Sequence, residues 1–99
     1  MENELKQINK AYAKKLNKVN GLNHFIEYLK YLRDSIVIKT GSAKALECNS
    51  AAVALIVTLN EFDAYKNSKE EKQRKFHWDN FWEFVKLNME EWLVLNDSV

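Results

Sequence analysis

Proline is missing from this chain of 99 residues, glycine occurs only as Gly21 and Gly41, and the single cysteine is Cys48. Scarce proline and glycine leave few places where the backbone can turn sharply. One cysteine excludes an internal disulfide and suits a reducing compartment. The amino-terminal stretch MENELKQINK lacks the apolar segment of a secretion signal, and no apolar run approaches the ~18 residues of a membrane span. We therefore expect a cytoplasmic protein with no membrane partner.

The chain as a whole also has almost no excess of positive or negative charge, although the charges are unevenly distributed along it. The formal net charge of +1 offers no overall field for nucleic acid or for an acidic partner. Residues 1–40 hold eight Lys/Arg against four Asp/Glu, whereas residues 41–99 hold seven against ten. Halves of opposite sign indicate either packing within the molecule or attraction between copies, and both interpretations stay open.

What is present is the composition of an ordinary globular domain. Hydrophobic residues make up 46% of the chain and charged residues 29%, which is too apolar for a disordered protein. The length predicts one helical domain over residues 1–99, and a chain of this size buries only about two-thirds of its unfolded surface. The core is therefore expected to be thin.

Helix-forming residues and apolar positions at helical spacing predict an all-α fold that resembles a four-helix bundle. We expect helices over residues 2–19 and 23–38, a third from residue 42, and a long fourth over residues 68–95. Asn20 and Gly21 tolerate the left-handed conformation that ends a helix, so the first turn is placed there.

Local signals refine the starts and the burial of these helices. Asn23 is the expected cap of the second helix, and Ser68 and Glu71 have the spacing of a capping box for the fourth. Within the third helix, the stretch AAVALIVTL, residues 51–59, is apolar nearly all the way round. A helix of that kind is expected at the centre of the fold.

The stretch FHWDNFWEFVKLNMEEW, residues 76–92, carries more aromatic surface than one face of a small bundle needs. At 100° per residue its apolar side chains cover about half of the helix circumference. This half-cylinder is either core, packed between two other helices, or an exposed docking surface, since Trp and Met are enriched where proteins bind one another. The predicted protein-binding residues are Trp78, Phe81, Trp82, Val85, Met89 and Trp92.

A symmetric homodimer is the expected way to cover both this aromatic helix and the all-apolar third helix. Beside the aromatic face, a stripe of acidic residues is expected to orient a partner. Its members are Asp79, Glu83, Glu90 and Asp97.

The first helix has a basic side opposite its apolar stripe. These lysines would meet phosphates in a nucleic-acid complex, or they form a solvated helix face. They are the candidate nucleic-acid-binding residues Lys6, Lys10, Lys14, Lys15 and Lys18.

The stretch AKALECNSAAVALIV, residues 43–57, resembles the core of a helix-turn-helix DNA-binding motif. The resemblance implies a turn before Ser50 and a second helix that enters the major groove. Where that family usually carries glycine in the turn, this chain has Glu47, and side chains such as Ala51 and Thr58 cannot read bases as Arg or Asn do. Small side chains here would instead let two helices approach closely, which is the alternative interpretation.

Residues with catalytic or metal-binding chemistry are few and scattered. His24 and His77 lack a second ligand at metal spacing, and Cys48 has no neighbouring His or basic residue to activate it. Glu90 and Glu91 point about 100° apart on a helix, which does not suit paired acid–base carboxylates. We therefore predict no catalytic, metal or cofactor site.

Together these features predict a small non-enzymatic protein-protein interaction module of the cytoplasm, an adaptor or inhibitor that docks a helical face on a larger partner or on itself. Blocking a large host machine needs no active site, so a phage-like or plasmid-encoded inhibitor is one form of this hypothesis. The alternative is a nucleic-acid-binding regulator that uses the basic first helix and the helix-turn-helix-like stretch.

Overall fold

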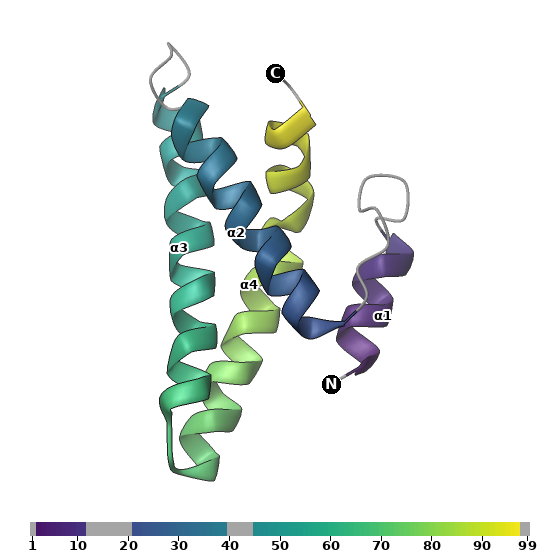
Figure 1. Ribbon diagram of the computed structural model, residues 1–99, viewed down its shortest axis with the longest axis vertical. Helices are drawn as coiled ribbons and strands as arrows, with labels where there is room; N and C mark the ends of the chain where they lie inside the picture. Colours follow the sequence, from purple (N-terminus) through teal and green to yellow (C-terminus); the bar gives the residue numbers. More distant parts are fainter. Residues whose placement is uncertain (1, 12–20, 40–44, 98–99) are drawn as a thin grey trace.

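The computed structural model describes residues 2–11, 21–39 and 45–97. Its helices are α1 (Glu2–Ala11), α2 (Leu22–Lys39), α3 (Ala45–Asn67) and α4 (Glu71–Asp97), and the described residues contain no strand (Figure 1). The all-α prediction with four helices is therefore confirmed.

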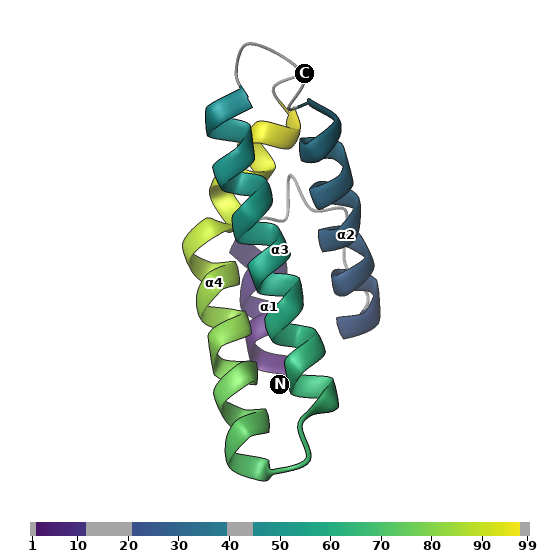
Figure 2. The same ribbon diagram turned by 90° about the vertical axis from the view of Figure 1, so that its left-hand side faces the viewer.

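An antiparallel hairpin of α3 and α4 forms the body of the molecule, and α2 packs across both of its helices (Figures 1 and 2). The shorter α1 lies on the side of the molecule away from α3 and reaches the core through Ile8. The principal extents of 44, 25 and 19 Å reflect the length of the hairpin. The tightest packing thus involves three helices, with α1 at the periphery.

Gly21 provides the turn before α2. Its φ of 111° lies in the region that favours glycine, and its carbonyl oxygen accepts a hydrogen bond of 3.0 Å from the Phe25 amide. Gly21 therefore occupies the capping position, and Asn23 lies inside the first turn of α2 rather than before it. The predicted turn is confirmed at Gly21, whereas the cap predicted at Asn23 is wrong; Asn20 lies outside the described residues.

α3 runs without interruption from Ala45 to Asn67. The turn implied by the helix-turn-helix resemblance is therefore wrong, because the backbone is helical through Glu47 and Ser50. No glycine or proline occurs in this helix, and the alanines and leucines that follow Ser50 favour its continuation. The buried Thr58 hydroxyl is satisfied within the helix, since it donates a hydrogen bond of 2.7 Å to the Ala54 carbonyl oxygen.

The connection between α3 and α4 differs from the predicted capping box. The Ser68 hydroxyl and amide both donate to the Ala64 carbonyl oxygen, at 2.6 and 2.9 Å. Ser68 thereby closes the end of α3 instead of starting α4. The first turn of α4 is closed by a hydrogen bond of 3.0 Å from the Arg74 amide to the Glu70 carbonyl oxygen.

The core lies where α2 meets the α3–α4 hairpin, and α4 contributes its largest side chains. The buried apolar residues are Ile8, Phe25, Ile26, Leu29, Leu32, Ile36, Ala51, Ala52, Leu55, Leu59, Phe62, Phe81, Trp82, Val85, Met89, Trp92 and Leu93. The third helix is not enclosed, so its predicted central position is wrong. Among the described helices only α2 and α4 pack extensively against α3, and its third side carries exposed apolar side chains.

Candidate interaction surfaces

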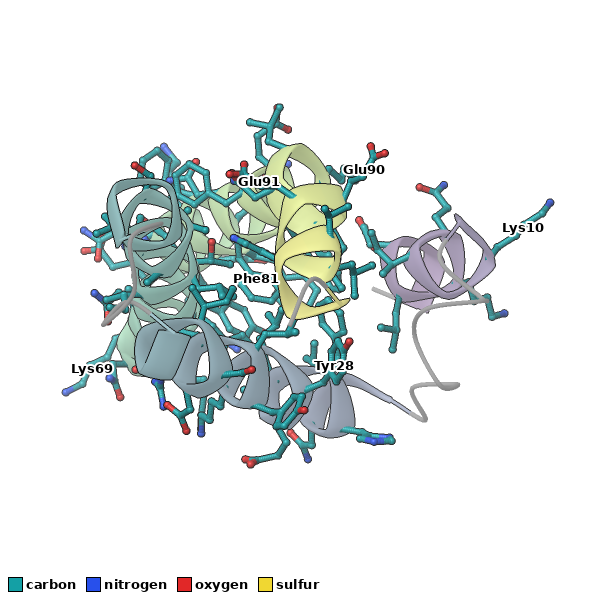
Figure 3. The ribbon with its side chains drawn as sticks, turned by 90° about the horizontal axis from the view of Figure 1, so that it is seen from above. Lys10, Tyr28, Lys69, Phe81, Glu90 and Glu91 are labelled. Carbon is teal, nitrogen blue, oxygen red and sulfur yellow. The ribbon has the colours of Figure 1, made fainter. Side chains whose placement is uncertain are left out.

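The six predicted protein-binding residues of α4 do not form an exposed surface. Five of them, Phe81, Trp82, Val85, Met89 and Trp92, are buried, and Trp78 is half-buried against the same core. Figure 3 shows Phe81 pointing into the space between α4, α3 and α2. The expectation that these residues form an exposed docking face is therefore wrong, and they belong to the core of the chain.

Neighbouring helices cover this aromatic half-cylinder with rings of their own. Phe25 of α2 stacks on Trp82, with ring centroids 5.6 Å apart and an interplanar angle of 10°. From α3, Phe62 contacts Phe81 at 5.4 Å. Each of these ring pairs lies within the range of favourable aromatic packing, so the chain covers the aromatic face itself.

The described part of the chain provides no hydrogen-bond acceptor for the two buried indoles. Within the described part of the chain, neither Trp82 Nε1 nor Trp92 Nε1 has a partner. An unsatisfied buried donor costs about 1–3 kcal/mol, which the large apolar area of an indole can offset. These two tryptophans therefore contribute to the core through apolar packing. They differ from tryptophans at the edge of a core, whose N–H group points to solvent.

The outward side of α3 carries an exposed apolar face, which we call the α3 face: Val53, Ile56 and Val57. Their side chains are 58%, 42% and 41% exposed. Spacings of three and four residues gather them within an arc of about 100°. No charged residue occurs between Ser50 and Asn60, and Figure 2 shows α3 in front of α2 and α4 with its outward side uncovered by either.

The outer side of α4 carries a second exposed face of different chemistry, which we call the α4 strip. Leu87 and Val94 are 72% and 48% exposed and lie two helical turns apart. Three exposed carboxylates flank them: Glu83, Glu90 and Glu91. In Figure 3, Glu90 and Glu91 lie on the outer side of α4, away from Phe81 and from α2.

A histidine–carboxylate pair joins α3 to α4. His77 Nδ1 lies 2.6 Å from Glu61 Oε2, and both side chains are half-buried. No local pattern predicts this contact, because the two residues are far apart along the chain and only the hairpin register brings them together. In the described part of the chain, no three His, Cys, Asp or Glu side chains gather as metal ligands.

The remaining predicted site residues are dispersed. Lys6 and Lys10 of α1 are exposed, and Figure 3 shows Lys10 pointing away from the other helices. In the acidic stripe Asp79, Glu83 and Glu90 are exposed. Outside the residues whose side chains are described lie Lys14, Lys15, Lys18, Cys48 and Asp97.

Comparison of the chain with protein-family models, curated proteins and solved structures gave no match. Among the described helices, none combines the length and the apolar character needed to cross a lipid bilayer. The features of the described structure that bear on function are therefore its two exposed faces, the α3 face and the α4 strip.

Proposed function

We propose that this chain is a small non-enzymatic protein-protein interaction module of the cytoplasm that pairs with a second copy of itself through the α3 face. The observation that carries the proposal is the exposure of Val53, Ile56 and Val57 on an uncharged side of α3. In the paired form it acts as an adaptor or inhibitor towards a larger protein. Catalysis forms no part of the proposed function.

A second copy suits the α3 face because the face is uncharged. Across a two-fold axis the same patch meets itself, so any charge within it would lie near its own like charge. Two α3 helices crossing in antiparallel orientation would place Ile56 of each copy near Val57 of the other. Such an interface has only apolar contacts at its centre, as obligate homodimers commonly do.

The α3 face must extend onto α4 to reach the size of a stable interface. A standard interface covers about 800 Å² per partner, which is more than three side chains supply. The Glu61–His77 contact fixes the antiparallel register of the hairpin. Counting seven residues from Glu61 towards the start of α3, and seven from His77 towards the end of α4, this register predicts that Ala54 lies opposite Phe84; both are half-buried. These two side chains would widen the apolar contact where α3 adjoins α4.

The test replaces the apolar side chains at the centre of the α3 face by charge. We expect the wild-type protein to sediment as a dimer and the variant Val53→Lys/Val57→Lys to sediment as a monomer, because four buried ammonium groups would meet across the axis. Circular dichroism establishes that the variant is still helical.

Phe76→Lys serves as the matched control for the dimer. Phe76 is an exposed apolar residue of α4 that lies outside the α3 face, and we expect its replacement to leave the dimer intact. A wild-type protein that remains monomeric at high micromolar concentration would contradict the proposal.

Nucleic-acid binding is the second candidate function, and the exposure of Lys6 and Lys10 on α1 favours it. The uninterrupted α3 removes the support that the helix-turn-helix resemblance provided. The exposed carboxylates of α4 also oppose the approach of a polyanion.

A further inference from the structure

We infer that the α4 strip is a docking site for a basic amphipathic helix of another protein. The inference deepens the proposed function, since it names the class of larger partner. It rests on the interaction role of the chain and does not require the dimer.

The apolar part of the α4 strip has the spacing of a helix-binding surface. Leu87 and Val94 are seven residues apart and therefore lie on one side of α4, about 10 Å from each other. Leu87 is 72% exposed, the highest value among the large apolar side chains that are exposed in the described structure. An amphipathic helix typically docks through anchors that repeat at this same distance of two turns.

Carboxylates border the apolar line on both sides. Relative to Leu87, Glu90 and Glu83 are rotated about 60° and 40° to one side of α4, and Glu91 about 40° to the other. Residues 83–94 contain these three glutamates and one cation, Lys86, which leaves a net charge of −2. The centre of the α4 strip is thus apolar, and its two borders are acidic.

Among the described residues, these three carboxylates take part in no ion pair. Elsewhere in the described structure Glu27 pairs with Lys30, Asp34 with Arg33 and Glu61 with His77. Within the same described residues, no ion pair engages the glutamates of the α4 strip. Their negative field is therefore available to an approaching partner.

Charge decides which partner fits the α4 strip. A second copy of this strip, an acidic helix, a nucleic acid or an anionic membrane would bring like charge against Glu83, Glu90 and Glu91. A helix that carries leucines on one side and lysines or arginines at its borders matches both parts of the surface. The aliphatic stems of its basic side chains would lie over Leu87 while their charged ends reach the glutamates.

The experiment measures fluorescence anisotropy of a labelled synthetic helix built of leucine and lysine at amphipathic spacing. We expect the wild-type protein to bind it, with affinity that falls as salt is added. A peptide with glutamate in place of lysine, and one with serine in place of leucine, should both bind at least ~10-fold more weakly, because each lacks one half of the complementary chemistry.

Variants of the protein locate the site. Leu87→Ser and Glu90→Lys/Glu91→Lys should each weaken binding of the basic helix by ~10-fold or more. Glu71→Lys is the matched control, since Glu71 is an exposed glutamate of α4 outside the strip, and it should change affinity by less than ~2-fold. Because Leu87, Glu90 and Glu91 are all exposed, these changes leave the core intact.

Three results would overturn the inference: no binding of the basic helix, equal binding of the acidic helix, or unchanged binding by the Leu87 and Glu90/Glu91 variants. A dimer that dissociates in Glu90→Lys/Glu91→Lys would also overturn it, because the occupant would then be a second copy. The variant Val53→Lys/Val57→Lys should still bind the basic helix, so loss of the dimer and loss of this docking site are distinguished.

Discussion

At the scale of single residues, burial separates side chains that look alike in the sequence. Trp82 and Leu87 both belong to the apolar or aromatic set of α4, yet Trp82 is buried against Phe25 while Leu87 is 72% exposed. The difference arises from their positions on the helix, about 140° apart around its axis. Trp82 therefore contributes to stability, and Leu87 is available for binding.

We predict that Trp82→Ala lowers the free energy of unfolding by about 3–5 kcal/mol, because it removes a buried indole and leaves a cavity. Leu87→Ala should change it by less than about 0.5 kcal/mol, as expected for an exposed site. Urea denaturation of both variants at one protein concentration checks the contrast. Equal stability of the two variants would show that the indole is not part of the core.

At the scale of elements, the ends of the helices depend on a few backbone positions. Gly21 allows α2 to begin after a turn with φ of 111°, and Ser68 ends α3 through its bonds to the Ala64 carbonyl oxygen. Between α3 and α4 the Glu61–His77 pair holds the hairpin in register. These contacts lie where α2 begins, where α3 ends and where α3 and α4 are aligned in the hairpin.

We predict that Gly21→Ala destabilises the protein by about 1–2 kcal/mol, since an L-residue with positive φ is strained. A Cβ at this position would meet no atom within 4 Å, so the cost comes from the backbone and not from a clash. Asn23→Ala, at an exposed position within the first turn of α2, is the control and should be nearly neutral. Thermal unfolding of both variants provides the comparison, and an unaffected Gly21→Ala would contradict the strain argument.

At the scale of the whole molecule, the exposed faces point in different directions. The outward side of α3 and the peripheral α1 lie on opposite sides of the core, and the outer side of α4 lies between them (Figures 1 and 3). Pairing through the α3 face would therefore leave the α4 strip of each copy free. A dimer of this kind would offer two docking sites to a larger partner, which raises avidity when both are engaged.

We predict no measurable binding of a short DNA duplex at low ionic strength. The exposed carboxylates of α4 outnumber Lys6 and Lys10 of α1, and their negative charge repels the phosphates of DNA. Gel shift or anisotropy with the full chain measures this directly. Binding that weakens steeply with salt and is lost in Lys6→Glu/Lys10→Glu would instead support the nucleic-acid candidate.

The amino-acid sequence by itself determined the all-α class, the four helices and the turn at Gly21. These features follow from local chemistry: helix-forming residues, apolar positions at helical spacing, and a glycine where φ is positive. The helix across Ser50 and the role of Ser68 were missed, because the same local residues suit either a cap or a helix, and packing of the surrounding turns decides between them.

Only the tertiary structure decided which apolar faces are covered. The aromatic side of α4 is the most aromatic surface in the sequence, and it is buried because Phe25 of α2 and Phe62 and Tyr65 of α3 pack against it. Val53 and Val57 are exposed although their stretch is apolar all round, since a helix flanked by two neighbours keeps a third side open. Burial depends on contacts between residues far apart in the chain, and no local pattern of α3 or α4 contains that information.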